Sequence, residues 1–213
     1  MLQCDILTIF PAIFDSYFKE SIIKRALEKK LIKINIHNFR DFAKDKHKTV
    51  DDRPYGGGPG MILKVEPIYR CLANIKRRKK SKIVLLTPKG KTFNQKIAST
   101  LSKLNQLILI CGRYEGFDER VRKLVDQEIS IGDYVLTGGE LPAMVIVDTV
   151  ARLIPGIIEA ESLAEETFYK KGYIEYPQYT RPEVFESLKV PRVLLSGDHK
   201  KIREWRKRHE RKK

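Results

Sequence analysis

The sequence predicts an α/β fold built on a largely parallel sheet. Short apolar runs alternate along the chain with segments whose apolar residues recur at helical spacing, which is the pattern of βαβ units. Two of these runs, residues 83–88 and 107–111, are almost entirely apolar, as are strands buried on both faces of a parallel sheet. With 213 residues and 42% hydrophobic content, the chain can bury a sizeable core. The length allows one large domain, alone or with a small appendage.

The first forty residues read as strand, helix and strand. Residues 2–10 are predicted to form a buried strand that ends at Pro11. Residues 12–29 carry apolar side chains at helical spacing, so we expect a helix there. Residues 31–39 alternate apolar and polar side chains, which predicts a second strand.

The rest of the domain continues the alternation. Proline in its first turn and a Pro-Gly pair after its end bound a long helix that begins near Glu140. The remaining predicted elements are helices over residues 65–75 and 94–104 and strands over residues 83–88 and 107–111.

The composition changes near residue 159 and divides the chain. We expect an α/β domain over residues 1–158, an acidic linker over 159–175 and a small helical unit over 176–213. Within that unit, residues 184–188 and 198–211 are predicted to be helical. In the last helix, Ile202 and Trp205 share a face that should dock it, which leaves its many cations outward.

The charge balance points to a polyanionic partner. Lys and Arg number 42 against 27 Asp and Glu, a formal net charge of +15. Each phosphate that such a protein neutralises releases counterions, so nucleic acid is the leading partner class. A generally lysine-rich proteome is the alternative reading. The basic run at residues 76–82 is either a solvated linker or a phosphate contact.

Cysteine and histidine usage argues against disulfides and transition metals. The three cysteines are far apart in sequence and form no Cys-x-x-Cys pair, which favours reduced thiols in a cytoplasmic protein. The four histidines form no metal-binding pattern. No signal peptide or membrane span is expected, because Asp148 and Arg152 interrupt the longest apolar region.

Three predicted strand ends carry unusual loops. These are Thr87-Pro88, the glycine-rich residues 112–116 and the glycine-bracketed residues 130–142. Ligands bind outside the carboxyl ends of strands in open α/β sheets, and glycine lets backbone approach a ligand closely. One pocket is therefore expected to collect all three loops.

A further long loop covers residues 41–64 and holds a glycine- and proline-rich stretch at 51–61. A loop of this length in a compact domain is typically functional, although a flexible surface loop has the same composition. No nucleotide P-loop is present in the sequence, because Gly90-Lys91-Thr92 lacks the upstream glycine.

Four motifs together resemble one family. Residues 52–61, 111–116, 130–142 and 179–183 match, in order and spacing, the bacterial tRNA (guanine-37-N1)-methyltransferases, the TrmD-type members of the SPOUT or trefoil-knot superfamily. The resemblance implies an α/β fold with a trefoil-knotted parallel-sheet methyltransferase domain, followed by a small α-helical C-terminal domain. It also implies a homodimer with active sites at the subunit interface. The implied reaction moves a methyl group from S-adenosylmethionine to N1 of the guanine immediately 3′ of the anticodon of tRNA.

The resemblance also assigns residues. The tRNA substrate would be bound by Asp51, Pro59, Gly60 and Arg181, the first three of which would hold the target guanine. The C-terminal unit, short for the family, would bind the anticodon arm. The implied S-adenosylmethionine pocket consists of Leu86, Gly112, Glu115, Ser130, Ile131, Gly132, Asp133, Tyr134, Val135, Leu136, Gly138, Gly139 and Leu141.

Two side chains are implied to be catalytic. Methylation of guanine N1 requires a base for its proton and a cation near O6. The resemblance assigns the cation to Arg152 and places Glu166 where the family has an aspartate base. Glu165 is the neighbouring alternative, and the assistance of Mg²⁺ is left open.

Two other functions fit the composition without the motifs. A basic α/β chain with a basic, tryptophan-bearing tail is also typical of a noncatalytic RNA-binding or ribosome-associated protein. Such a protein has no need of a glycine-walled pocket. A nucleotide-dependent enzyme fits less well, because the phosphate loops are incomplete.

Overall fold

The computed structural model describes residues 1–170 and 172–212. The chain divides into two compact units, Met1–Ile158 and Glu159–Lys213. The first unit holds a five-stranded sheet with helices on both faces, so the predicted α/β class is confirmed.

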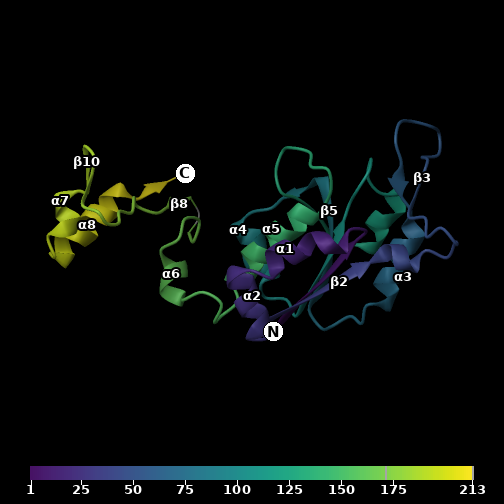
Figure 1. The fold of residues 1–213 in the computed structure, drawn as a ribbon, viewed down its shortest axis with the longest axis horizontal. Coiled ribbons are helices and arrows are strands. Elements are labelled where there is room, and N and C mark those ends of the chain that lie inside the picture. The colour runs from purple at the N-terminus through teal and green to yellow at the C-terminus, as the bar shows by residue number, and fades with distance from the viewer. Residues whose placement is uncertain (171, 213) are drawn as a thin grey trace. The chain divides into compact units, whose positions relative to one another are not determined.

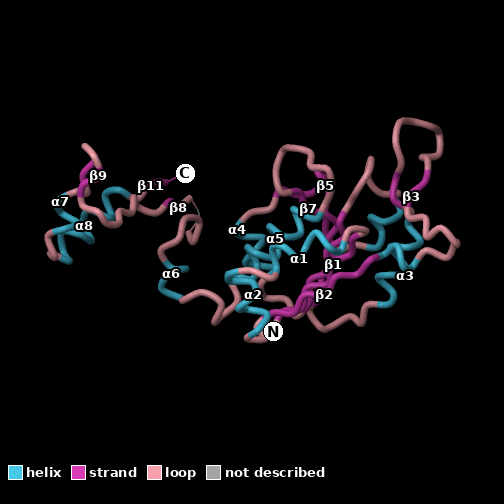
Figure 2. Tube along the Cα trace, in the orientation of Figure 1, coloured by secondary structure: helices cyan, strands magenta, loops and turns pink. Residues whose placement is uncertain are grey.

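The sheet of the first unit is entirely parallel. Its strands lie in the order β2-β1-β6-β5-β7, so β1 pairs with both β2 and β6 (Figure 2). The strands are β1 (Leu2–Thr8), β2 (Ile32–Asn38), β5 (Ser81–Thr92), β6 (Gln106–Cys111) and β7 (Gln127–Ser130). A separate short antiparallel ladder joins β3 (Asp51–Asp52) to β4 (Ile62–Leu63).

Alternate residues of the central strands face two hydrophobic cores. Leu107, Leu109 and Cys111 of β6 belong to the first core, whereas Ile108 and Ile110 belong to the second. Every residue of β6 is buried, as its uninterrupted apolar sequence predicts.

Helices cover the two faces of the sheet and close the cores. The first core lies under α2 (Ser21–Glu28), α4 (Gln95–Leu101) and α5 (Glu140–Arg152), and the second lies under α3 (Val65–Asn74). Figure 1 shows α3 on the opposite side of the sheet from the other three. The second core also takes Phe39 from η2 (Phe39–Phe42) and Val121 from η3 (Glu119–Leu124), two 3₁₀ segments.

The predicted single helix over residues 12–29 is wrong. The segment forms a 3₁₀ turn η1 (Pro11–Phe14), a short α1 (Asp15–Phe18) and then α2. The chain breaks at Ser21, which has a left-handed φ of +50°. The break thus separates α1 from α2, whereas Phe14 and Phe18, both buried, lie before it and stack with ring centroids 5.5 Å apart at the i,i+4 spacing of a helical turn.

The second unit contains helices and two short ladders. Its helices are α6 (Ala160–Ala164), α7 (Arg192–Leu195) and α8 (His199–His209), and β8 (Tyr173–Ile174) pairs antiparallel with β11 (Arg211–Lys212). As expected, Trp205 docks α8: it is 9% exposed and its ring lies edge-on to Tyr179 with centroids 6.3 Å apart. Trp205 also stacks on His209 of the same helix at 4.1 Å.

One predicted helix of this unit is wrong. Residues 184–188 instead begin a hairpin of β9 (Val184–Phe185) and β10 (Leu188–Lys189). The side chains of both strands are exposed, so burial of an apolar face does not stabilise a helix here. Glu186 adopts φ +52° in the turn, and the β-branched and aromatic pair before it favours an extended backbone.

Candidate active site

A cavity of about 400 Å³ opens at the carboxyl ends of three neighbouring strands. It is lined by residues at the end of the apolar part of β5, by the loop that follows β6 and by the loop that follows β7. The structure thus brings together Thr87-Pro88, residues 112–116 and residues 130–142 around one pocket. The volume suits a small-molecule ligand.

Most residues of the implied cofactor set line this cavity. The predicted residues on its wall are Leu86, Gly112, Glu115, Ser130, Ile131, Tyr134, Val135, Leu136, Gly138 and Gly139. Gly132, Asp133 and Leu141 belong to the same loop or helix start but are not among the lining residues, whereas Pro142 is. The sequence prediction also missed Arg113, Tyr114 and Phe117, which lie on the wall beside predicted positions.

The glycines allow the loops to touch each other. The Gly139 N–H donates to the Gly112 oxygen at 2.9 Å, and a Cβ on Gly139 would lie 2.7 Å from Cα of Cys111. A Cβ on Gly112 would lie 2.8 Å from Cε2 of Phe117. Gly139 therefore requires glycine because the two loops press against each other, and Gly112 requires it because the Phe117 ring of its own loop fills the space, in addition to any close approach by a ligand.

A hydrogen-bonded network of three side chains connects the loops of the cavity to β1. Glu140, 1% exposed, begins α5 and accepts a hydrogen bond from Thr8 Oγ1 at 2.7 Å. Its other carboxylate oxygen accepts from Arg113 Nε at 3.0 Å. Arg113 Nη1 then donates to the Thr137 oxygen at 3.3 Å, and its guanidinium carbon lies 4.6 Å from the ring centroid of Phe10. We name Thr8, Arg113 and Glu140 the brace.

The brace links β1, the loop after β6 and the start of α5. A Cβ on Gly138 would overlap both Arg113 and Glu140, so the brace fills the space that a side chain at this position would need. A buried carboxylate needs such partners, because its desolvation is otherwise costly. The sequence gives no signal for the Thr8–Glu140 bond, which spans 132 residues.

The cysteine nearest the cavity is unreactive. Cys111 is buried under the loop contact, and burial together with the Glu140 charge raises its thiol pKa well above the ordinary value. Burial also raises the pKa of Cys4 and Cys71 to about 12. Thiolate chemistry is therefore suppressed at all three.

The glycine-rich loop of residues 51–64 docks on the loop after β6. Glu115 N donates to the Met61 oxygen at 3.0 Å, and Leu63 N donates to the Gly116 oxygen at 2.9 Å. Gly60 has φ +73°, and a Cβ there would overlap the Glu115 side chain. The implied substrate loop and the implied cofactor residue Glu115 are consequently in direct contact.

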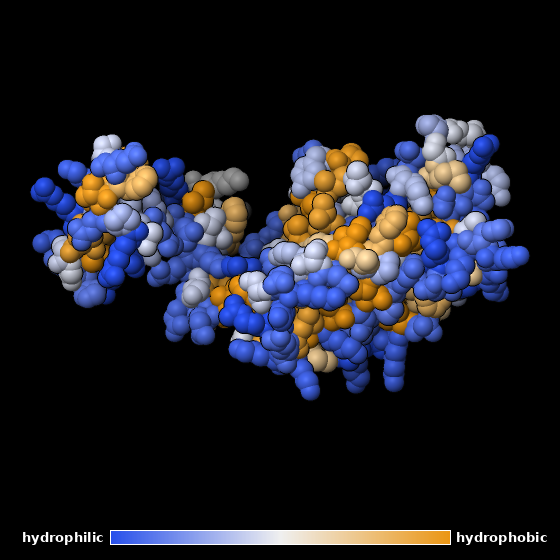
Figure 3. Space-filling view, in the orientation of Figure 1, coloured by the Kyte–Doolittle hydropathy of each residue, from blue (hydrophilic) through white to orange (hydrophobic). Residues whose placement is uncertain are grey.

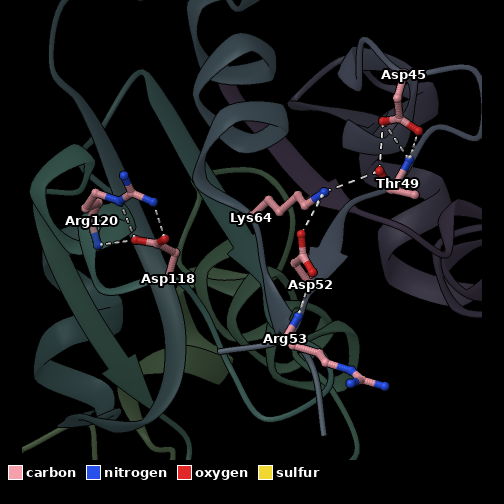
Figure 4. A network of polar contacts seen from close by, with 7 residues as sticks. All are labelled: Asp45, Thr49, Asp52, Arg53, Lys64, Asp118 and Arg120. Atoms are coloured by element: carbon pink, nitrogen blue, oxygen red, sulfur yellow. Dashed lines mark hydrogen bonds and ion pairs between the residues drawn. The ribbon is translucent and has the colours of Figure 1, made fainter. Parts of the chain in front are cut away.

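Polar contacts stiffen the base of this loop. Asp52, in β3, forms an ion pair with Lys64 at 3.4 Å and accepts from the Arg53 N–H at 2.9 Å (Figure 4). These contacts lower the pKa of Asp52. Asp51 is half-buried and pairs with Leu63 in the β3–β4 ladder. Pro59 lies exposed near the tip.

The implied catalytic residues lie in different units. Arg152 is the last residue of α5 and is half-buried. Glu166 follows α6 in the second unit and is half-buried, whereas the neighbouring Glu165 is exposed and accepts from the Tyr176 hydroxyl at 2.9 Å. Arg181, also in the second unit, is exposed.

The described residues also bear on metal binding and on membrane insertion. Across residues 1–170 and 172–212, no group of three or more His, Cys, Asp or Glu side chains is placed to hold a metal ion. Within the same residues, every helix is too short or too polar to cross a membrane.

The match to a known family extends over almost the whole chain. Residues 2–213 match the family described as tRNA (Guanine-1)-methyltransferase TrmD. The chain belongs to this family. A tRNA (guanine-N(1)-)-methyltransferase of Dictyoglomus turgidum is 58% identical over 214 residues, covering 100% of this chain and 86% of the relative.

Other members of the family are nearly as similar. Proteins of the same name from Mycoplasmopsis synoviae and Clostridioides difficile are 55% and 54% identical. They cover 96% and 97% of this chain, and 90% and 91% of their own lengths is matched.

Proposed function

We propose that this protein is a methyltransferase that moves a methyl group from S-adenosylmethionine to N1 of the guanine immediately 3′ of the anticodon of tRNA, position 37. The observation that carries the proposal is the cavity at the ends of β5, β6 and β7, built from the loops that carry the family's motifs.

The cavity fits S-adenosylmethionine. Its wall combines apolar side chains such as Leu86 and Leu136 with backbone polar groups freed by glycine, which suits an adenine ring and its hydrogen-bonding edge. When bound, S-adenosylmethionine supplies an electrophilic methyl group on sulfur. We assign its binding to the residues named in the sequence analysis, with Gly132, Asp133 and Leu141 acting by shaping the loop.

The chemistry asked of the protein is modest. A carboxylate must accept the N1 proton of guanine, and a cation must balance the charge that develops on O6. We assign the first role to Glu166 and the second to Arg152. Glu165 is the competing base, although its bond from the Tyr176 hydroxyl already occupies one oxygen. Asp51, Pro59 and Gly60 would hold the guanine beside Glu115.

We further propose a homodimer with interfacial active sites. Five large apolar side chains are exposed on or beside three neighbouring elements of the first unit: Phe10, Ile13 and Tyr17 around η1 and α1, and Leu141 and Val145 on α5. On the face drawn in Figure 3, hydrophobic residues gather over this region. Exposed apolar surface of this kind is typical of a subunit interface, and it adjoins the helix that carries Arg152.

The tRNA would be bound through its anticodon arm by the second unit, with Arg181 as one contact. The net charge of +15 and the six Lys and Arg residues of α8 support this assignment. We place the enzyme in the cytoplasm, where its three free cysteines stay reduced. A role for Mg²⁺ is tested by assaying methyl transfer with and without a chelator.

The deciding experiment compares two unmodified tRNA transcripts that differ only in carrying guanine or adenine at position 37. With radiolabelled S-adenosylmethionine, we expect transfer to the guanine transcript alone. Equal labelling of both would refute the specificity. The absence of any S-adenosylmethionine binding by calorimetry would instead favour a noncatalytic RNA-binding protein.

A further inference from the structure

A second cavity of about 370 Å³ lies wholly within the C-terminal unit. One wall is formed by three tyrosines that follow α6 in the chain, namely Tyr169, Tyr173 and Tyr176. The other wall is the face of α8 that carries Arg203 and Arg206 and continues to Glu210, at spacings of three and four residues. Glu165 and Lys170 also line this cavity.

The two walls are tied together at Tyr176. Its ring centroid lies 4.8 Å from the guanidinium carbon of Arg206, a cation–π contact, and its hydroxyl donates to Glu165 at 2.9 Å. The ladder between β8 and β11 pairs Tyr173 with residue 212 and so holds the tyrosine segment against the end of α8. The pocket is therefore a built feature of this unit.

One polar atom of the pocket has no partner. Arg206 Nε is shielded from solvent, and the described residues supply no hydrogen-bond acceptor for it. A buried N–H donor without an acceptor is unfavourable. A small rotation of the Arg206 side chain would turn this N–H toward the pocket, where an acceptor on a ligand would remove the cost.

The lining selects the chemistry of the ligand. Tyrosine rings and an arginine plane are surfaces on which unpaired bases stack in RNA-binding proteins. Glu165 and Glu210 would repel a phosphate but accept hydrogen bonds from base N–H groups. A nucleobase offers a flat apolar face, N–H donors and ring or carbonyl acceptors together, which matches all three features of the lining.

We propose that this pocket takes one unpaired nucleobase of the RNA substrate, turned out of its loop and stacked on the tyrosine wall, with an acceptor on the base bound to Arg206 Nε. This inference rests on the proposed tRNA substrate. It adds a base-binding site that is separate from the cavity at the strand ends. Through this site the C-terminal unit would recognise an anticodon loop with one base turned outward, in addition to binding the charged RNA backbone.

The test uses the full chain and anticodon stem-loop RNAs that carry 2-aminopurine at one unpaired position at a time. We expect one position to change its fluorescence on binding, because its base enters the pocket and stacks. Arg206→Lys removes Nε and the planar fork while keeping the charge, so it should abolish that change and weaken stem-loop binding about ten-fold, within the range for losing one stacked base.

The matched control is Arg208→Lys. Arg208 lies on the same helix but donates from Nε to the Glu204 backbone oxygen at 3.4 Å, outside the pocket lining. It should leave the fluorescence change intact. A second variant, Tyr173→Leu, removes a stacking face without altering charge and should reproduce the loss, with circular dichroism and thermal melting used to verify folding.

Four outcomes overturn the inference. They are a fluorescence change that survives Arg206→Lys, equal loss in Arg208→Lys, no responsive position although the wild-type protein binds the stem-loop, or a smaller salt dependence of binding as the only effect of Arg206→Lys. The last would identify a phosphate contact. Failure of the wild-type protein to bind any stem-loop would instead refute the proposed function, and this inference with it.

Discussion

At the residue scale, a single buried carboxylate is the most densely bonded group in the sheet. Asp5 of β1 is 1% exposed and accepts hydrogen bonds from His37, Gln106, Asn35 and Gln3 at 2.8 to 2.9 Å. Burial alone would raise its pKa, but the four hydrogen bonds outweigh burial and lower the pKa to about 2. Asp5 therefore joins three neighbouring strands through its charge.

This lowered pKa predicts a pH dependence of stability. The contribution of a carboxylate with a depressed folded pKa is complete above its unfolded pKa near 4 and is lost as pH falls toward 2. We expect the difference in unfolding free energy between the wild type and Asp5→Asn to shrink by about 2 kcal/mol between pH 5 and pH 2. Urea denaturation across this range measures it. The exposed Asp15→Asn serves as control, and a parallel pH dependence for Asp5→Asn and wild type would contradict the assignment.

The proposed base gives a second prediction at this scale. Glu166→Gln preserves shape but cannot accept the N1 proton, so single-turnover methylation should slow while S-adenosylmethionine still binds. Glu165→Gln is the matched comparison, because the two carboxylates are adjacent. If Glu165→Gln alone slows the reaction, the base is Glu165, and normal rates in both variants would remove this segment from the proton transfer.

Arg152 provides a third prediction at the residue scale. Replacing a preorganised charge partner of the developing oxyanion typically costs about 100-fold or more in rate. We expect a loss of that size for Arg152→Ala, measured in a single-turnover assay at saturating S-adenosylmethionine. Arg192→Ala, on α7 of the second unit, is a control for a general loss of positive charge. A wild-type rate in Arg152→Ala would assign Arg152 to a structural contact.

The sequence motifs predicted which residues lie around the pocket, but they did not predict which residues those would contact. Gly112 and Gly139 were expected to make room for a ligand. The structure adds that Gly139 makes room for the backbone of Cys111 and Gly112, and that Gly112 makes room for the Phe117 ring. Side-chain pairs such as Glu140 with Thr8 depend on which strands become neighbours, and no local pattern in the sequence encodes that.

At the element scale, the start of α5 depends on the brace. Glu140→Gln replaces one acceptor oxygen by an NH2 donor and removes the charge that orients Arg113. We expect S-adenosylmethionine to bind about ten-fold more weakly, since a charge-assisted hydrogen bond contributes about 1.5 to 3 kcal/mol. Isothermal titration measures the affinity, with the surface variant Glu28→Gln as control. Unchanged affinity would show that the loops hold their shape without the brace.

Element boundaries were predicted where apolar pattern and packing agree. The strand at residues 107–111 and the helix ended by Pro155-Gly156 fall within a residue or a few of β6 and α5. The short β7 was not bounded in advance, because four residues of mixed polarity carry little periodicity. The helix expected over residues 12–29 was wrong, because the backbone takes a left-handed φ of +50° at Ser21 and a new helix starts there, which the spacing of apolar residues does not indicate.

At the scale of the whole molecule, the exposed apolar side chains of η1, α1 and α5 predict the assembly. A charge at Val145, which is 45% exposed, should be trapped in the proposed interface, so Val145→Asp should weaken the dimer at least about 100-fold. Light scattering after size-exclusion chromatography measures this. Val184→Asp, at an exposed valine of the second unit, is the control. A wild-type mass for Val145→Asp would move the interface elsewhere.

The α/β class followed from periodicity, and the family followed from four motifs. The trefoil knot stays a prediction from the family resemblance, because chain connections are ordinarily unknotted and no periodicity in the sequence indicates a threaded chain. The second cavity had no sequence signal either, since its tyrosines and arginines come together only when the segment after α6 packs on α8.

The position of β1 as an interior strand, paired on both edges, has a consequence for biosynthesis. β1 leaves the ribosome first and can pair with β2 soon afterwards, but its other edge waits for β6, which begins at Gln106. At about 5 to 20 residues per second, roughly 3 to 14 seconds separate the two events. During that interval the nascent chain presents an open, apolar strand edge, the kind that chaperones shield and that pairs wrongly with other chains.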